Sequence, residues 1–140
     1  MKILVAVDGS RYTKRMLAYL AAHDEWLGPH HSYTVLSVVA PVPSLAAAAV
    51  AKDLLKAHYA EDSEKVLKPV RAFLGRHGLA VEYVTKIGAV AETIASLAGK
   101  GKYDLLMMGS HGQGSLGNLV LGSVATKVMA LCDTPVLLVR

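Results

Sequence analysis

Short apolar runs of strand length alternate along the chain with stretches of helical periodicity, and this alternation limits the folds that are available. The apolar runs cover residues 2–7, 33–39, 79–85, 104–108 and 134–140. Between them, apolar residues recur every three to four positions, as they do on one face of a helix. Strands that alternate with helices form a parallel sheet with right-handed crossovers. We therefore predict an α/β fold with five parallel strands and helices on both faces of the sheet.

The length of 140 residues suits one domain that covers residues 1–140. Mean hydropathy is positive, at +0.38, but every apolar run is much shorter than the roughly 18 residues that a membrane span needs. The first apolar run ends too early, at Asp8, to be a signal peptide. We expect no membrane contact and a cytoplasmic location. Cys132 is the only cysteine, which excludes an internal disulfide and a metal site built from thiols.

The net charge of +4 would favour an anionic partner. The basic residues are scattered, however, and no basic stripe interleaved with aromatic residues is present, so nucleic-acid binding is not expected. The adjacent His30 and His31 have no cysteine or carboxylate at ligand spacing. We predict that they are exposed loop residues and that the chain holds no metal through its own side chains.

The first apolar run ends at Asp8-Gly9-Ser10, and Ser10 is a suitable N-cap for the helix that follows, which we expect to reach about Leu27. Asp8 thus lies at the carboxyl end of the first strand, the edge at which open α/β sheets bind ligands. It suits either a ligand contact or a turn. An alanine-rich stretch, Leu45 to Ala51, should continue into a long helix to about Arg76, bent or interrupted at Pro69. The alanine-rich stretch is a candidate mobile lid or partner surface.

A glycine-rich loop at residues 109–118, followed by Gly122-Ser123, lies between the fourth strand and the last helix. The start of a helix presents unpaired N–H groups and the positive end of the helix dipole. Glycines allow the main chain to approach an anion closely. The loop is therefore predicted to bind phosphate.

Three phosphate-binding patterns compete for this loop. Residues 112–117 match G-x-G-x-x-G, but only one strand remains after them, whereas a dinucleotide site needs a second strand that carries an acidic residue. Residues 117–124 have P-loop glycine spacing, but Ser123 stands where the lysine should be, which excludes that site. The third pattern fits completely: Gly109, two residues, Gly112, nine residues, then Gly122-Ser123.

This third pattern, together with residues 104–112, 121–125 and 134–139, resembles the universal stress protein family, and its glycines resemble those of the ATP-binding subgroup. The resemblance implies the strand order 3-2-1-4-5, as in the adenine nucleotide alpha hydrolase-like fold. Strands one and four would then be neighbours, and Asp8 and the glycine loop would open onto one crevice. The resemblance also implies a homodimer that pairs through the C-terminal strand, which is apolar and lies at an edge.

The resemblance further implies a set of nucleotide-binding residues. Three line the adenosine pocket, two close it, and four hold the phosphates, in this order: Ala6, Asp8 and Val38; Met108 and Gly109; Gly112, Gly122, Ser123 and Val124. His111 is a further candidate donor, or alternatively a loop histidine in solvent. Ala6 and Ser37 depart from the family, which often has proline and histidine at these positions. The departures affect the base pocket and leave every phosphate donor in place.

The implied ligand is ATP or ADP, with Mg²⁺ bridging the phosphates mainly through water. Phosphoryl transfer needs a cation on the developing charge, and the loop contains no lysine or arginine. We therefore predict an ATP-binding, homodimeric stress-response regulatory module with slow or no hydrolysis. One alternative is a nucleotide hydrolase or nucleotidyl transferase, although the H-x-G-H string of related transferases is absent. The other is a nucleotide-free protein interaction module.

Overall fold

The computed structural model describes residues 1–114, 118 and 120–140 and contains a five-stranded parallel sheet. The strands are β1 Lys2–Val7, β2 Ser32–Val39, β3 Val81–Ile87, β4 Leu105–Gly109 and β5 Val136–Val139. Their order is β3-β2-β1-β4-β5, and every neighbouring pair is parallel. The predicted fold class and strand order are confirmed.

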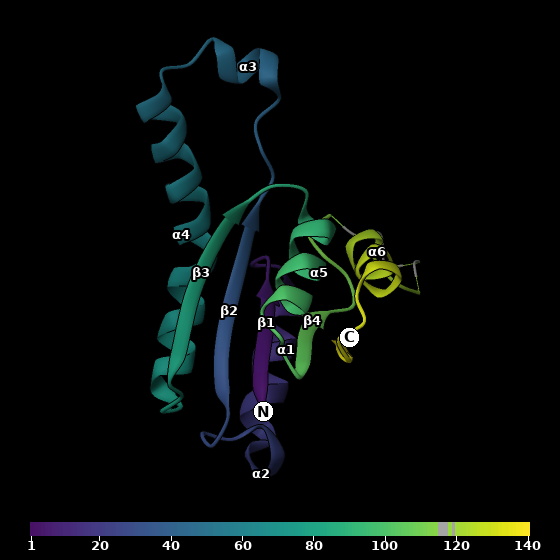
Figure 1. The fold of residues 1–140 in the computed structure, drawn as a ribbon. Helices are drawn as coiled ribbons and strands as arrows, with labels where there is room; N and C mark the ends of the chain where they lie inside the picture. Colours follow the sequence, from purple (N-terminus) through teal and green to yellow (C-terminus); the bar gives the residue numbers. More distant parts are fainter. Residues whose placement is uncertain (115–117, 119) are drawn as a thin grey trace.

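Helices cover both faces of the sheet (Figure 1). They are α1 Arg11–Ala22, α2 Asp24–Leu27, α3 Ser44–Ala48, α4 Lys52–Arg76, α5 Val90–Lys100 and α6 Ser123–Leu131. Helices α1 and α4 lie on one face, and α5 and α6 lie on the other (Figure 1). Within the part of the chain that the structure describes, none of these helices is long and apolar enough to cross a membrane.

The alternation of side chains along β1 explains why this strand is apolar from Ile3 to Val7. Ile3, Val5 and Val7 belong to the buried cluster on the side of α1 and α4. Leu4 and Ala6 belong to the cluster on the side of α5 and α6. Because successive side chains of a strand point to opposite faces, a central strand covered on both sides has no polar position.

Several boundaries differ from the predictions, among them the start of β5, which lies at Val136 instead of residue 134. The first helix is divided, because α1 ends at Ala22 and His23 separates it from α2. The alanine-rich segment does not run directly into the long helix, because Ala51 has an extended main chain between α3 and α4. The third strand begins two residues later than predicted. The N–H of Leu79 still bonds to the carbonyl of Leu74 at the end of α4, which delays the strand.

Pro69 lies inside α4 and does not interrupt it, so of the two predicted outcomes the interruption is wrong, and a bend stays a prediction. Leu67, Val70 and Leu74 on either side of the proline are almost completely buried in the core. We attribute the continuity of the helix to this packing, which outweighs the one hydrogen bond that proline removes. The long, continuous α4 and the short α3 project beyond the carboxyl edge of the sheet (Figure 1).

Candidate functional site

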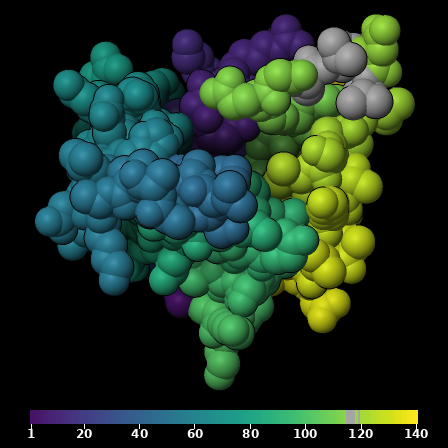
Figure 2. Space-filling view, turned by 90° about the horizontal axis from the view of Figure 1, so that it is seen from above, coloured from purple at the N-terminus to yellow at the C-terminus, as the bar shows by residue number. Residues whose placement is uncertain are grey.

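A cavity of about 650 Å³ opens at the carboxyl edge of the sheet, where β1 has β2 on one side and β4 on the other. Figure 2 looks down on this edge, and the surface is hollowed between the segment around α3 (blue) and the loop after β4 (light green). The sheet reverses its winding between β1 and β4, and ligands bind at such a reversal in open α/β sheets. The volume is within the usual range for small-molecule sites.

All ten residues predicted from the sequence line this cavity: Ala6, Asp8, Val38, Met108, Gly109, His111, Gly112, Gly122, Ser123 and Val124. They come from β1, β2, β4, the glycine loop and α6. The structure therefore brings them together, while their contacts with a ligand stay a prediction. Residues 115–117 of the predicted loop lie outside the described residues, and so does residue 119.

Asp8 organises the turn between β1 and α1. Its Oδ1 accepts hydrogen bonds from the N–H of Ser10 and from Oγ1 of Thr13, both at 2.9 Å. Its own N–H donates to Thr13 Oγ1 at 3.1 Å, and Ser10 caps α1 as predicted. Asp8 is thus both a turn residue and a residue of the cavity wall. The sequence analysis did not select Thr13, although a threonine in the first turn after Asp-Gly-Ser was a usable signal.

The three glycines of the signature are each in close contact with another part of the protein. A methyl group on Gly109 would lie 2.6 Å from Cβ of Tyr12. On Gly112 it would lie 2.9 Å from Oδ2 of Asp8, and on Gly122 it would lie 2.9 Å from Cα of His111. These distances are shorter than van der Waals contact. The glycine pattern therefore has a packing reason that does not depend on a ligand.

The start of α6 faces the cavity with unpaired N–H groups. Gly122 donates its N–H to the carbonyl of Ser110 at 2.8 Å, which closes the loop at its base. The first helical bond of α6 joins the N–H of Thr126 to the carbonyl of Gly122 at 3.0 Å, and no side chain caps this end. The N–H groups of Ser123 and Val124 are therefore free of the helix ladder at a point that lines the cavity. This arrangement suits an anion.

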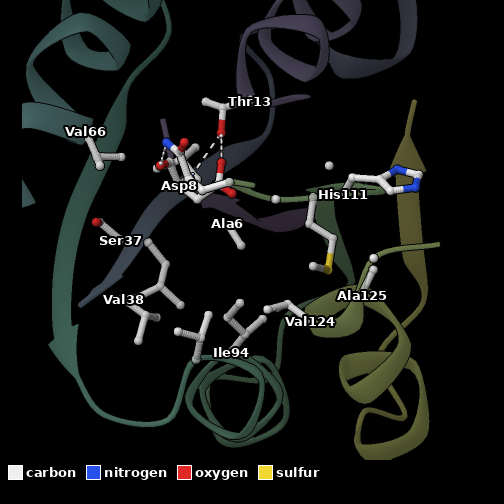
Figure 3. Close-up of a pocket in the computed structure, with 18 of the residues that line it drawn as sticks. Ala6, Asp8, Thr13, Ser37, Val38, Val66, Ile94, His111, Val124 and Ala125 are labelled. Atoms are coloured by element: carbon white, nitrogen blue, oxygen red, sulfur yellow. Dashed lines mark hydrogen bonds between the residues drawn. The ribbon is translucent and has the colours of Figure 1, made fainter. Parts of the chain in front are cut away.

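His111 borders the cavity, but its ring points away from the other labelled side chains (Figure 3). The imidazole stacks on Tyr12 with ring centroids 4.9 Å apart. Its Nδ1 lies 2.8 Å from the hydroxyl of Ser110, and the residue is buried. The alternative of a histidine in solvent is therefore wrong. In this conformation the ring supports the loop, and its role as a donor to phosphate stays a prediction.

The walls of the cavity include residues that the sequence analysis did not select as site residues. Among them are Val90 and Ile94 of α5, Asp62 and Val66 of α4, and Gln113 of the loop. Ile94 and Val66 recur at helical spacing with other apolar residues of α5 and α4, and this periodicity does not distinguish a core position from a cavity wall. The side-chain amide of Gln113 donates to the carbonyl of Asp8 at 3.1 Å and joins the loop to the first turn.

The charged side chains that line the cavity are both acidic. They are Asp8 and Asp62, and no lysine or arginine is present among the described lining residues. Positive potential at this site therefore comes from main-chain N–H groups and the α6 dipole. In addition, the described residues contain no group of three or more metal-ligating side chains.

Comparison with known proteins agrees with this geometry. The family model described as "Universal stress protein family" matches residues 1–140. The chain belongs to the universal stress protein family. A curated relative, the universal stress protein in the QAH/OAS sulfhydrylase 3′ region of Thermus aquaticus, is 36% identical over 141 residues. That alignment covers 99% of this chain and 97% of the relative.

Solved structures of universal stress proteins have the same fold. The protein MJ0577, from Methanocaldococcus jannaschii, is 25% identical, with a TM-score of 0.82 over 99% of this chain and 94% of its own. The Archaeoglobus fulgidus protein in complex with dAMP is 20% identical, with a TM-score of 0.67 over 100% and 98%. Other solved members are complexes with cAMP and with AMP. At 17–20% identity these complexes demonstrate similarity of fold alone.

Proposed function

We propose that this universal stress protein binds ATP, as its Mg²⁺ complex, in the cavity at the carboxyl edge of the sheet. The observation that carries the proposal is the position of the α6 start. Its free N–H groups lie at one end of a cavity whose floor is apolar, with Ala6, Val38 and Ile94 contributing to it. An apolar floor suits a base, and a helix start suits phosphates. The adenine nucleotides in solved members of the family support the same ligand class.

The residues fit a magnesium nucleotide better than the free anion. With only Asp8 and Asp62 charged among the described lining residues, a triphosphate gains no side-chain cation. Mg²⁺ binds readily to phosphate oxygens and keeps several water ligands, so it does not need a protein cage. When bound, the ion neutralises phosphate charge. The main-chain N–H groups of Gly112, Ser123 and Val124 would orient the phosphate chain.

The same lining argues for a regulatory module with slow or no hydrolysis. Rapid phosphoryl transfer uses a cation placed on the developing charge and a residue that positions the attacking group. The described lining residues include no lysine or arginine that could supply this cation. The His111 ring, a candidate for positioning the attacking group, points away from the other labelled side chains of the cavity. A bound nucleotide that is not turned over changes the state of the protein instead of supplying a product.

We also propose that the protein forms a homodimer through β5. This strand lies at the edge of the sheet, and its four residues are only partly buried. Met129 and Leu131, at the end of the neighbouring α6, are about half exposed. An apolar edge strand with exposed apolar neighbours is suited to pairing with a second copy.

Calorimetric titration of nucleotide-stripped protein with Mg-ATP and Mg-ADP tests the ligand. We expect saturable binding at micromolar concentration or tighter, and weaker binding when EDTA removes Mg²⁺. Turnover of bound ATP should be far below the roughly 1–100 s⁻¹ of kinases. No heat of binding at several temperatures would favour the nucleotide-free interaction module, and turnover in the kinase range would favour an enzyme.

A further inference from the structure

Three basic side chains occupy one exposed face at the start of α1. Arg11, Lys14 and Arg15 are all exposed, and their spacing of three and four residues places them side by side on the helix surface. We name these three residues the α1 basic face. A second hollow, of about 250 Å³, lies beside it and is lined by residues 10–12 and by residues 112–114 of the glycine loop. Figure 2 shows the first part of the chain (purple) next to the loop after β4 (light green).

The α1 basic face has no acidic partner within the described part of the chain. The ion pairs among the described residues all join side chains of α4. The first turn of α1 contains no acidic residue. Asp8, the acidic residue closest in sequence, accepts hydrogen bonds from Ser10 and Thr13 and lines the main cavity instead. The three positive charges are therefore available to an external anion.

This placement of charge is unfavourable for the helix itself. Cations near a helix N-terminus oppose the helix dipole, and like charges four residues apart, here Arg11 and Arg15, repel each other. By contrast, α4 and α5 each carry an acidic residue in the first turn, Asp53 and Glu92. Proteins tolerate such local costs mainly at functional sites. The cost therefore indicates that the α1 basic face serves an interaction outside the helix.

Tyr12 holds the two arginines in place. Its side chain is buried, and the guanidinium carbon atoms of Arg11 and Arg15 lie 5.0 Å and 5.6 Å from the centroid of its ring. Nη2 of Arg11 also donates to the Tyr12 hydroxyl at 3.0 Å. Stacking on a ring orients a guanidinium without using the N–H groups at its edge, which can still bind a carboxylate through two parallel hydrogen bonds. Both arginines are thus oriented before a partner binds.

We propose that the α1 basic face docks an acidic segment of a partner protein. Arg11 and Arg15 are about 6 Å apart along the helix axis, and alternate residues of an extended peptide are separated by roughly the same distance. Carboxylates at two such positions can therefore bind both arginines. A partner bound here would also touch residues 112–114, which line the main cavity as well. The inference does not depend on the proposed nucleotide binding.

The same surface is less suited to other anionic partners. A nucleic acid needs a longer basic track with accessible aromatic rings, but Tyr12 is buried, and the exposed face of α1 continues after Arg15 with Ala18. The hollow of about 250 Å³ is smaller than the usual small-molecule site, which disfavours a free small anion. An acidic protein segment fits both the short extent of the charge and the shallow surface.

Titration of the ¹⁵N-labelled, nucleotide-free full chain with a capped hexaglutamate peptide tests the surface. We expect saturable amide shifts at Arg11, Lys14, Arg15 and Gly114, and an affinity that falls several-fold as the salt concentration rises from about 0.01 M to about 0.1 M. Arg11→Gln combined with Arg15→Gln, compared at the higher salt concentration, should weaken binding by about tenfold or more, the worth of charged hydrogen bonds.

The matched control is Lys52→Gln combined with Lys56→Gln. It removes the same charge at the same spacing from the exposed start of α4, and it should keep the affinity within about twofold, because distant charges are screened at this salt concentration. The shift map uses the unmodified protein and so does not depend on the folding of a variant. No shifts at α1, or an arginine variant that binds as tightly as the lysine control, would overturn the inference. Tighter binding of inorganic phosphate or of a thymidine oligonucleotide at the same residues would also overturn it, in favour of a small anion or of nucleic acid.

Discussion

Ser123→Asp should abolish most nucleotide binding while leaving the protein at least as stable as before. The new carboxylate would occupy the first turn of α6, where the proposed phosphates lie. Two like charges about 4 Å apart near a protein surface repel by ~4 kcal/mol, so Mg-ATP affinity should fall by about 100-fold or more. The same carboxylate interacts favourably with the helix dipole and should stabilise α6 by about 0.3–1 kcal/mol. Calorimetry and urea unfolding measure the two effects separately.

The control for this variant is Ser96→Asp, which adds the same charge on the exposed side of α5, away from the cavity. Its affinity for Mg-ATP should stay within about twofold, because a charge on the exposed side of α5 is screened by water and salt. Equal affinities of Ser123→Asp and the unmodified protein would show that the phosphates do not lie at α6. Reduced stability of Ser123→Asp would contradict the dipole argument.

Gly109→Ala should destabilise the protein by about 1–3 kcal/mol, the usual cost of an added methyl group in a packed interior. The new methyl would lie 2.6 Å from Cβ of Tyr12 and 3.2 Å from the carbonyl oxygen of His111. Neither neighbour is the flexible end of a side chain, so β4 and α1 have to separate. We expect a lower midpoint of urea unfolding with an unchanged slope.

Gly99→Ala is the matched control, because it places the same methyl inside α5 with no atom within 4 Å. Alanine should stabilise this exposed helix position by about 0.5–1 kcal/mol. The two substitutions are chemically identical and should change stability in opposite directions. A midpoint for Gly109→Ala at or above that of the unmodified protein would mean that the close approach of Gly109 to α1 is not required by the fold.

Much of the fold could be predicted from the sequence, because the local periodicity and capping signals agree with the elements that form. The β1 run, the Ser10 cap and the start of α6 lie where periodicity and capping indicated. One failure has a tertiary cause: core packing of Leu67 and Val70 carries α4 through Pro69, and this packing is not visible in local sequence. The other is local, because the hydrogen bond of Leu79 to Leu74 extends the end of α4 past Gly78 and delays β3.

The candidate site was predictable only in part. Residues adjacent to strand ends, such as Asp8 and Gly109, could be selected because the carboxyl edge of a parallel sheet is a known binding position. Asp62 could not be selected in this way, because it reaches the cavity only through the packing of a helix that follows a long crossover. His111 shows that a position can be predicted when a side-chain direction cannot. The residue lines the cavity as predicted, but its imidazole stacks on Tyr12 and points away from the other labelled side chains.

The central claim, that a nucleotide lies in this cavity with its phosphates at α6, is tested most directly by following amide chemical shifts during a titration of ¹⁵N-labelled protein with Mg-ATP. The account predicts the largest shifts at the N–H groups of Gly112, Ser123 and Val124, smaller shifts at Asp8, and almost none at Gly78, which lies at the opposite edge of the sheet, just before β3. Saturable shifts confined to another surface, or no shifts at the start of α6, would contradict it.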